Sequence, residues 1–301
     1  MRGNLPGMDD DATRPDHRWA RSFGPVAEAY DRGRPGYSPQ AASWLVGREA
    51  ASVLELGAGT GKLTAELVTQ GHDVHATDPD ERMLEVLRAR VPGARASVAG
   101  AEELPAGDRS VDVVVAAQCF HWFDHDLALP EIARVLKAGG VLALVWNYRD
   151  DRIPWVRRLG DLIGTQEQLA DPTDVLAASK LFEPPASTTY MLWQDINRDS
   201  LVDLVSSRSN IVTLDDASRT AKLAEVVAFY DDFGRGYDGM QLPYLSRCFR
   251  ARVVDRLVTR AAESAGDLAG DLAGDLAAGG DQGPTSRNDG SDTDTLLIDF
   301  R

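Results

Sequence analysis

Three glycines alternate with small residues directly after a short apolar run. Residues 53–61 read Val-Leu-Glu-Leu-Gly-Ala-Gly-Thr-Gly, and a helical pattern begins at Lys62. A buried strand, a tight glycine turn and a helix start place backbone N–H groups where a ligand can approach without meeting a side chain. The spacing therefore predicts a site for a nucleotide-like ligand at the turn Gly57–Gly61.

Two common nucleotide-binding motifs fit this stretch poorly. A P-loop aligned on Gly61 puts Leu56 where its first glycine belongs and Leu63 where its magnesium-binding hydroxyl belongs. The dinucleotide motif needs G-x-G-x-x-G, whereas this turn is one residue shorter. A turn without any ligand is disfavoured, because three glycines cost conformational entropy unless a close approach requires them. The P-loop is thus excluded, and an NAD-linked enzyme stays an alternative.

An acidic residue follows the next apolar segment. Residues 72–78 read as a second strand ending in Asp78, and Pro79-Asp80 then opens an amphipathic helix. A carboxylate at the tip of a second strand can accept hydrogen bonds from both ribose hydroxyls of an adenosine. Asp78 could instead cap the helix, but Asp80 is better placed to do so. The pair of segments favours an adenosine-containing ligand.

With these residues the chain resembles the class I S-adenosylmethionine-dependent methyltransferases. Residues 53–61 match their E/D-x-G-x-G-x-G signature, with Glu55 as the acidic member, and Asp78 matches their ribose-binding acid. Four later segments resemble, in order, their adenine-facing segment, fourth strand, helix exit and fifth strand: Ala101–Pro105, Val111–Ala117, Leu136–Gly140 and Val141–Trp146. The resemblance covers roughly residues 20–150.

One stretch resembles a narrower branch of that family. Residues 118–123, Gln-Cys-Phe-His-Trp-Phe, are similar to the Q-A-F-H-W-F stretch of small-molecule enzymes similar to trans-aconitate methyltransferase. Upstream, Phe23, Tyr30 and the segment Arg34–Tyr37 resemble the F…Y…R-P-x-Y pattern of the same branch. Cys119 replaces a residue that is more often alanine there, a change of one small side chain for another. This resemblance indicates the cofactor better than it indicates the acceptor.

The resemblance implies a role for each cofactor residue. The turn would cradle the methionine end of S-adenosylmethionine, Glu55 would attract its ammonium group, and Asp78 would hold the ribose. Gln118 would offer a backbone carbonyl near the methionine moiety. The full set of implied cofactor residues is Glu55, Gly57, Ala58, Gly59, Gly61, Asp78, Pro79, Met83, Ala101, Glu102 and Gln118. Met83 would pack on the adenine, whose edge Ala101 and Glu102 would read. In-line transfer then needs alignment and no metal, and leaves S-adenosylhomocysteine.

The acceptor side offers fewer signals. His121 lies just past the fourth strand, where open α/β sheets bind ligands, and could deprotonate an acceptor hydroxyl or simply pack beside Trp122. Tyr30 could cover the cofactor or belong to the core. The expected acceptor-binding residues are Arg34, Trp122 and Arg149, and the two arginines could pair with an acceptor carboxylate. A carboxylate acceptor needs no general base, so it predicts an essential arginine and a dispensable histidine.

The family resemblance implies an α/β fold with a doubly wound, mostly parallel, seven-stranded Rossmann-like sheet. The methyltransferase domain is expected over 16–261, with its core at 50–150. Residues 151–261 are expected to supply two late strands, one of them antiparallel, and a helical cap inserted between the fifth strand and these two. Local patterns in this part indicate helices beginning at 153 and spanning 199–209 and 214–230, and a strand at 242–251.

Composition is that of an ordinary globular chain. The 301 residues are 43% hydrophobic and 26% charged, with two cysteines far apart in sequence. The net charge of −15 argues against a nucleic-acid partner. No run approaches the roughly 20 apolar residues of a membrane span, and the first residues lack the apolar core of a secretory signal. We therefore expect a cytoplasmic monomer or homodimer that acts on a small molecule.

The two ends of the chain differ from its middle. Residues 262–301 carry nine acidic residues and two arginines, and Ala-Gly-Asp-Leu occurs three times from Ala265 to Leu276. A four-residue period with glycine in every repeat favours neither a helix nor a core, so we expect a disordered acidic tail. Residues 1–15 are expected to be flexible. Besides the methyltransferase and the NAD-linked oxidoreductase, a non-catalytic S-adenosylmethionine-binding protein remains open.

Overall fold

The computed structural model describes residues 27–164, 171–233 and 239–254. Contacts between residues divide the chain after Val254. The predicted flexible N-terminus, the acidic tail and the predicted boundary at 261 all lie outside the described residues. Among the described residues no helix is long and apolar enough to cross a membrane.

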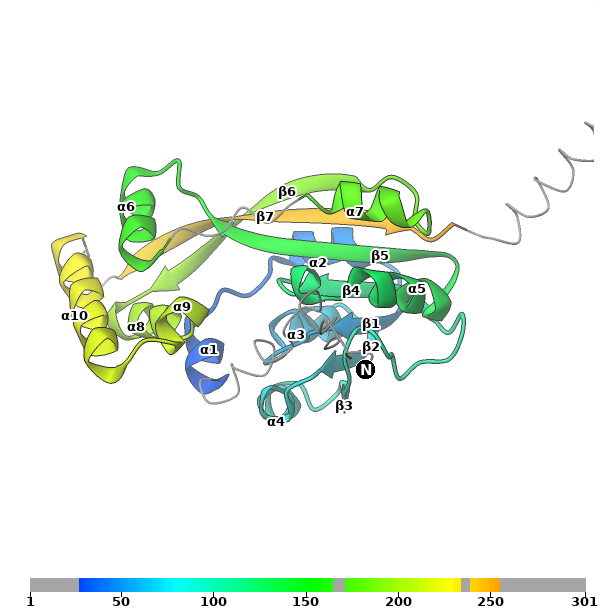
Figure 1. The fold of residues 1–301 in the computed structure, drawn as a ribbon, viewed down its shortest axis with the longest axis horizontal. Coiled ribbons are helices and arrows are strands. Elements are labelled where there is room, and N and C mark those ends of the chain that lie inside the picture. The colour runs from blue at the N-terminus through cyan, green and yellow to red at the C-terminus, as the bar shows by residue number, and fades with distance from the viewer. Residues whose placement is uncertain (1–26, 165–170, 234–238, 255–301) are drawn as a thin grey trace, which may run out of the picture. The chain divides into compact units, whose positions relative to one another are not determined.

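Seven strands form one sheet in the order β3-β2-β1-β4-β5-β7-β6, as Figure 1 shows. The strands are β1 (Ser52–Leu56), β2 (Asp73–Asp78), β3 (Arg95–Val98), β4 (Val111–Ala117), β5 (Leu136–Arg149), β6 (Ala186–Ile196) and β7 (Met240–Arg252). The first five are parallel, and β7 runs antiparallel to both β5 and β6. The predicted seven-stranded, mostly parallel sheet is confirmed.

Helices cover both faces of the sheet because successive residues of its central strands are apolar, so apolar side chains point to both sides. On one face Val145 and its neighbours pack against α2 (Pro39–Val46) and α3 (Lys62–Thr69). On the other face Leu144 and its neighbours pack against α5 (His125–Val135) and α7 (Pro172–Ser179). The helix α4 (Glu81–Arg90) contacts β2 and β3. This is the predicted amphipathic helix, and Met83, Leu84 and Leu87 form its buried face.

The segment 136–140 differs from its predicted role as a helix exit. The helix α5 ends at Val135 and β5 begins at once, pairing Leu136 with Val111. The next paired positions are Val141 and Val113, so several extra residues of β5 bulge out of the ladder. Gly139 takes a φ of +73°, which few residues other than glycine adopt. The glycines of segment 136–140 thus belong to a bulge inside a long strand, and a glycine-rich bulge of this kind resembles a loop in sequence.

The helical cap is divided differently from the prediction. The helices α6 (Pro154–Ile163) and α7 lie between β5 and β6, as expected. Three more, α8 (Arg198–Ser206), α9 (Ser209–Val212) and α10 (Asp216–Phe233), lie between β6 and β7. The helix predicted at 199–209 corresponds to α8, which ends at Ser206, and α9 begins at Ser209. The apolar side chains of α6, α8 and α10 share one cluster with Leu242 and Tyr244 of β7.

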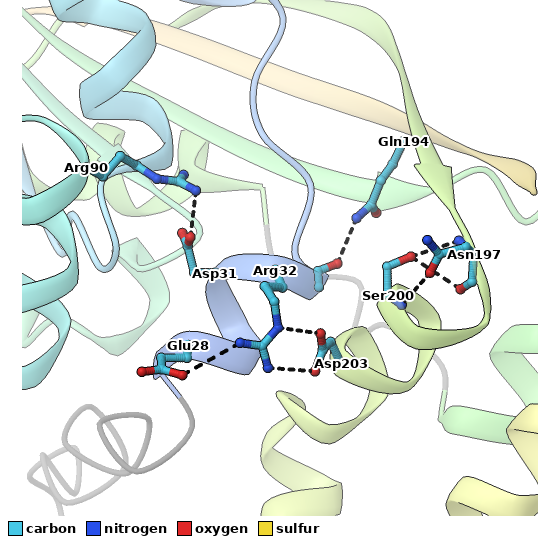
Figure 2. Close-up of polar contacts among 9 residues, drawn as sticks. Glu28, Asp31, Arg32, Arg90, Gln194, Asn197, Ser200 and Asp203 are labelled. Atoms are coloured by element: carbon cyan, nitrogen blue, oxygen red, sulfur yellow. Dashed lines mark hydrogen bonds and ion pairs between the residues drawn. The ribbon is translucent and has the colours of Figure 1, made fainter.

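The first described helix, α1 (Ala27–Gly33), makes polar contacts with α4 on one side and with α8 and β6 on the other (Figure 2). On one side its Asp31 accepts a 2.6 Å hydrogen bond from Arg90 of α4. On the other side Arg32 donates to both carboxylate oxygens of Asp203 in α8, at 2.8 and 3.2 Å. The Gln194 side chain of β6 donates to the Gly33 carbonyl at 2.7 Å. The polar contacts of α1 thus connect α8 and β6 to α4.

Candidate functional site

The glycine turn follows β1 and leads into α3. Gly57, Gly59 and Gly61 all have positive φ, between 56° and 79°, a region that disfavours other residues. A Cβ on Gly57 would lie 2.7 Å from Cys119 Sγ, and one on Gly61 would lie 2.7 Å from Leu87 Cγ. A Cβ on Gly59 would meet nothing within 4 Å. Two of the glycines are therefore required by packing, and the third leaves an open approach to the backbone.

Asp78 ends β2 beside this turn. Its carboxylate accepts 2.9 Å hydrogen bonds from the backbone N–H groups of Gly59 and Asp80. The helix α4 is capped by Asp80, which accepts from the N–H of Arg82, so Asp78 is free of that role, as predicted. Its side chain is buried, and burial raises its pKa to about 6. One carboxylate thus holds the glycine turn and has further lone pairs for a ligand hydroxyl.

Glu55 lies in β1, two residues before the turn. It is 1% exposed and accepts a 2.6 Å hydrogen bond from the Thr64 hydroxyl of α3. Burial raises its pKa to about 8, and the charge of Asp78 acts in the same direction, while the Thr64 hydrogen bond opposes both. A cationic ligand would reverse this balance, because an opposite charge favours the ionised carboxylate. The site is therefore built to gain from a bound cation.

These two pKa shifts predict how cofactor affinity depends on pH. The folded protein holds the protons of Asp78 and Glu55 more tightly than the unfolded chain does. The two protonated carboxyl groups therefore contribute to stability at low pH. This contribution is lost as the pH rises through about 6 for Asp78 and about 8 for Glu55. A ligand that prefers both ionised carboxylates must release protons on binding. We expect affinity for S-adenosylmethionine to increase from about pH 5 to about pH 7.5.

Calorimetry in two buffers of different ionisation enthalpy measures those protons. Glu55→Gln should release fewer protons at neutral pH than the unmodified protein. A constant affinity without proton release across this range would contradict the assignment of both carboxylates.

The loop after β4 approaches the turn from the other side. Gln118 has a φ of +63°, a strained value for a residue other than glycine. Its side-chain amide donates to the Asn147 carbonyl at 3.2 Å, and its N–H donates to the Val145 carbonyl at 2.9 Å. The next residue, Cys119, donates from Sγ to the Leu56 carbonyl at 3.1 Å. Neighbouring strands thus hold this loop in place, and Gln118 takes its positive φ directly after β4 ends.

The residues expected around an adenine lie on α4 and on two loops. Ala101 and Met83 are buried, and Pro79 is partly buried. Glu102 accepts a 3.1 Å hydrogen bond at Oε1 from the N–H of Asp124, the N-cap residue of α5. Glu102 therefore ties the 101–105 segment to the start of α5. That its carboxylate also reads an adenine edge stays a prediction.

His121 and Trp122 belong to a short 3-10 helix, η3 (Phe120–Trp122), directly after the Gln118 loop. Their rings lie 4.8 Å apart between centroids. His121 is an exposed residue, yet partial burial of its imidazole lowers the pKa of that ring to about 4, with a smaller contribution from His125. At neutral pH the imidazole is therefore uncharged and able to accept a proton.

Two tyrosines stand between the turn and the cap. Burial raises the pKa of Tyr30, which also feels the charges of Arg34, Asp78 and Cys119. Burial raises the pKa of Tyr37 well above its ordinary value, and Tyr30 and Glu55 act in the same direction. Both phenols are thus neutral hydroxyls at physiological pH. Tyr37 has no assigned role in the sequence-based set, although it lies close to the predicted site residues.

The two predicted acceptor arginines come together at the cap. Arg34 donates to the Ser207 hydroxyl and carbonyl at 3.0 and 3.1 Å, and its guanidinium lies 5.2 Å from the centre of the Tyr30 ring. Arg149, at the end of β5, donates to the Gly164 carbonyl at 2.9 Å. Arg208 donates to the same carbonyl at 3.3 Å. Sequence analysis did not find Arg208, because it belongs to no motif.

The described residues contain no group of three or more histidine, cysteine or acidic side chains that could hold a metal ion. They do contain a buried hydroxyl, Thr60 Oγ1, with no hydrogen-bond partner, in the glycine turn itself. That hydroxyl and the open face of Gly59 fit a ligand with polar groups at the turn. The residues present therefore suit a nucleoside-type cofactor.

Comparison with known proteins agrees with this geometry. The methyltransferase domain family matches residues 54–144. An uncharacterised methyltransferase of Mycobacterium bovis is 44% identical over 238 residues, which cover 76% of this chain and 95% of the relative. A malonyl-[acyl-carrier protein] O-methyltransferase of Methylococcus capsulatus is 37% identical over 150 residues, 46% of this chain and 54% of that protein.

A solved structure, assigned as a type II methyltransferase from Anaeromyxobacter dehalogenans, superposes with a TM-score of 0.55. It is 26% identical, and the match covers 73% of this chain and 97% of that one. The chain belongs to the class I S-adenosylmethionine-dependent methyltransferases. The expected fold family and enzyme class are thereby confirmed, and the roles of the individual site residues remain predictions.

Proposed function

We propose that this protein transfers the methyl group of S-adenosylmethionine to an oxygen atom, a carboxylate or a hydroxyl, of a small-molecule acceptor. The observation that carries the proposal is the Asp78 carboxylate, which holds the Gly59 N–H beside an unobstructed glycine turn. The printed name of the Methylococcus relative, an O-methyltransferase, supports oxygen as the acceptor atom. Tyr30, Tyr37 and His121 surround the acceptor side in this proposal.

The cofactor supplies an electrophilic methyl on a sulfonium, and the protein supplies alignment and shielding from water. The backbone of the turn holds the methionine end, Glu55 compensates its ammonium, and Asp78 orients the ribose. Gln118 contributes a carbonyl made available by its unusual φ. Aligning donor and acceptor in this way can lower the barrier by about 7–11 kcal/mol, so a general base is not always required.

Binding measurements separate this proposal from its two alternatives. A methyltransferase should bind S-adenosylmethionine and S-adenosylhomocysteine, and should not bind nicotinamide dinucleotides. The reverse preference would favour the NAD-linked oxidoreductase. Binding of S-adenosylmethionine without transfer to any member of a metabolite panel would favour a non-catalytic binding protein.

Replacement of His121 distinguishes the two kinds of oxygen acceptor. For a carboxylate acceptor, His121→Gln should leave kcat within about threefold of the unmodified enzyme, because the nucleophile is already ionised. For a hydroxyl acceptor, loss of the base should lower kcat by roughly 100-fold or more. Single-turnover rates with a saturating acceptor make the measurement, and His125→Gln on the neighbouring helix is the control. A large loss of kcat in His121→Gln with a carboxylate acceptor would contradict the expectation that an ionised acceptor needs no general base.

A further inference from the structure

Three guanidinium groups meet where the end of β5 faces the cap. Arg149 and Arg208 donate to one shared carbonyl, that of Gly164, at 2.9 and 3.3 Å. Arg34 is bound to Ser207, the residue directly before Arg208. Tyr244 pairs with Arg149 across β5 and β7, and its side chain is 3% exposed. The chain thus gathers three cations and a buried phenol from four separate segments.

Among the described residues, no carboxylate pairs with two of these cations. In the part of the chain that the structure describes, neither Arg34 nor Arg208 forms an ion pair. The Nε atom of Arg208 is buried without a hydrogen-bond partner. Burial, followed by the charges of Arg149 and Arg34, lowers the pKa of Arg208 to about 9. A buried N–H donor that has no acceptor and is surrounded by like charges is unfavourable unless a bound ligand accepts its hydrogen bond.

The position of this cluster relates it to the proposed acceptor. The last residue of β4, Ala117, pairs with Val145, so Arg149 lies four residues further along β5. That is about 13 Å of extended strand beyond the end of β4. Tyr30 links the two places, because its ring lies under the Arg34 guanidinium and its hydroxyl feels the charge of Asp78. Tyr30 is thus close to both the arginine cluster and the Asp78 side of the glycine turn.

We propose that Arg34, Arg149 and Arg208, with Tyr244, bind an anionic oxygen group of the acceptor, a carboxylate or a phosphate monoester. The inference rests on the proposed function, and it adds that the acceptor carries an anchoring anion several ångströms from the atom that is methylated. Guanidinium groups suit this role because their planar N–H donors match the oxygens of carboxylates and phosphates. An anion here would give Arg208 Nε its missing acceptor and offset the repulsion among the three cations.

Direct titration of simple anions tests the proposal. The protein, saturated with S-adenosylhomocysteine, is titrated with succinate, inorganic phosphate and the neutral succinamide in a calorimeter. We expect succinate or phosphate to bind and succinamide not to bind. Arg208→Gln should weaken anion binding by about 10- to 100-fold. The matched variant Arg198→Gln, whose arginine is on the exposed side of α8 and pairs with Asp231 at 2.7 Å, should stay within about twofold.

The readouts separate this inference from the function on which it rests. Binding of succinate alone identifies a carboxylate anchor, and binding of phosphate alone identifies a phosphate ester. The affinity of Arg208→Gln for S-adenosylhomocysteine should be unchanged. The unloaded protein is titrated as well, so a protein that fails to bind the cofactor product still reports on the anion site. The inference is overturned if neither succinate nor phosphate binds at concentrations up to ~10 mM. It is also overturned if Arg208→Gln binds the anion as tightly as the unmodified protein does.

The melting temperature shows whether Arg208→Gln has simply damaged the fold. Without anion, this variant should melt no lower than the unmodified protein, because it removes a buried cation with an unsatisfied donor. With anion, only the unmodified protein and Arg198→Gln should gain stability. A lower melting temperature of Arg208→Gln without anion, combined with unchanged anion binding, would assign the residue a structural role.

Discussion

Asp78→Ala is expected to weaken S-adenosylmethionine binding by about 100-fold, which corresponds to about 2.7 kcal/mol. The variant loses the acceptor for the Gly59 and Asp80 N–H groups, so the glycine turn loses its anchor. It also loses the proposed ribose contacts, and a single hydrogen bond to a charged group, worth about 1.5–3 kcal/mol, would account for this loss. Isothermal titration calorimetry at neutral pH measures the change directly.

The same strand offers a matched control for this variant. Asp73, at the other end of β2, is exposed and makes only an exposed ion pair with Arg95 at 3.2 Å. Asp73→Ala should keep the affinity within about twofold, since exposed ion pairs contribute little. Asp78→Asn keeps one acceptor oxygen and should fall between Asp78→Ala and the unmodified protein. A folded Asp78→Ala protein that binds within threefold of the unmodified one would overturn the ribose assignment.

Gly33→Ala is expected to destabilise the protein by about 2–3 kcal/mol, although alanine is the better helix former. Gly33 is the last residue of α1, and a Cβ there would overlap the backbone of α8, reaching within 2.5 Å of the Asp203 carbonyl carbon. Backbone cannot move aside as a flexible side chain can, so α1 must separate from α8. Because Tyr30 and Arg34 move with α1, acceptor turnover should fall more than cofactor binding.

Gly36→Ala is the control for this second variant. A Cβ on Gly36 would meet nothing within 4 Å, and the residue has no positive φ. Its effect should stay within about 0.5 kcal/mol. Thermal unfolding of both variants gives the comparison, with a shift of roughly 5–10 °C expected for Gly33→Ala alone. A Gly33→Ala protein as stable as the unmodified one would show that α1 does not dock on α8 through this contact.

The cofactor half of the site could be predicted from sequence because its chemistry is local. Glu55, the glycine turn and Asp78 lie within 24 residues, on consecutive strands that must be parallel neighbours in this fold. The three glycines have the positive φ that their spacing suggests, and Asp80 rather than Asp78 caps α4. Here each residue type has one clear physical use at its position.

The acceptor half could not be predicted in the same way. Arg34 and Ser207 are 173 positions apart and meet only because α8 packs on α1. Tyr244 reaches Arg149 through the antiparallel register of β7, which no local pattern fixes. Arg208 stands in a polar stretch without a motif, and the signal that identifies it is an unpartnered buried donor. The segment around Gly139 was predicted wrongly for a different reason, because a glycine-rich strand bulge looks like a loop in sequence.

The most direct test of methyl transfer uses S-adenosylmethionine with a deuterated methyl group. The purified protein is incubated with this cofactor and a panel of small molecules that carry a carboxylate or phosphate, and the products are examined by mass spectrometry. We predict a product heavier by one deuterated methyl group, formed by the unmodified protein and lost in Asp78→Ala. Tight binding of the cofactor with no labelled product from any acceptor in the panel would contradict the proposed reaction.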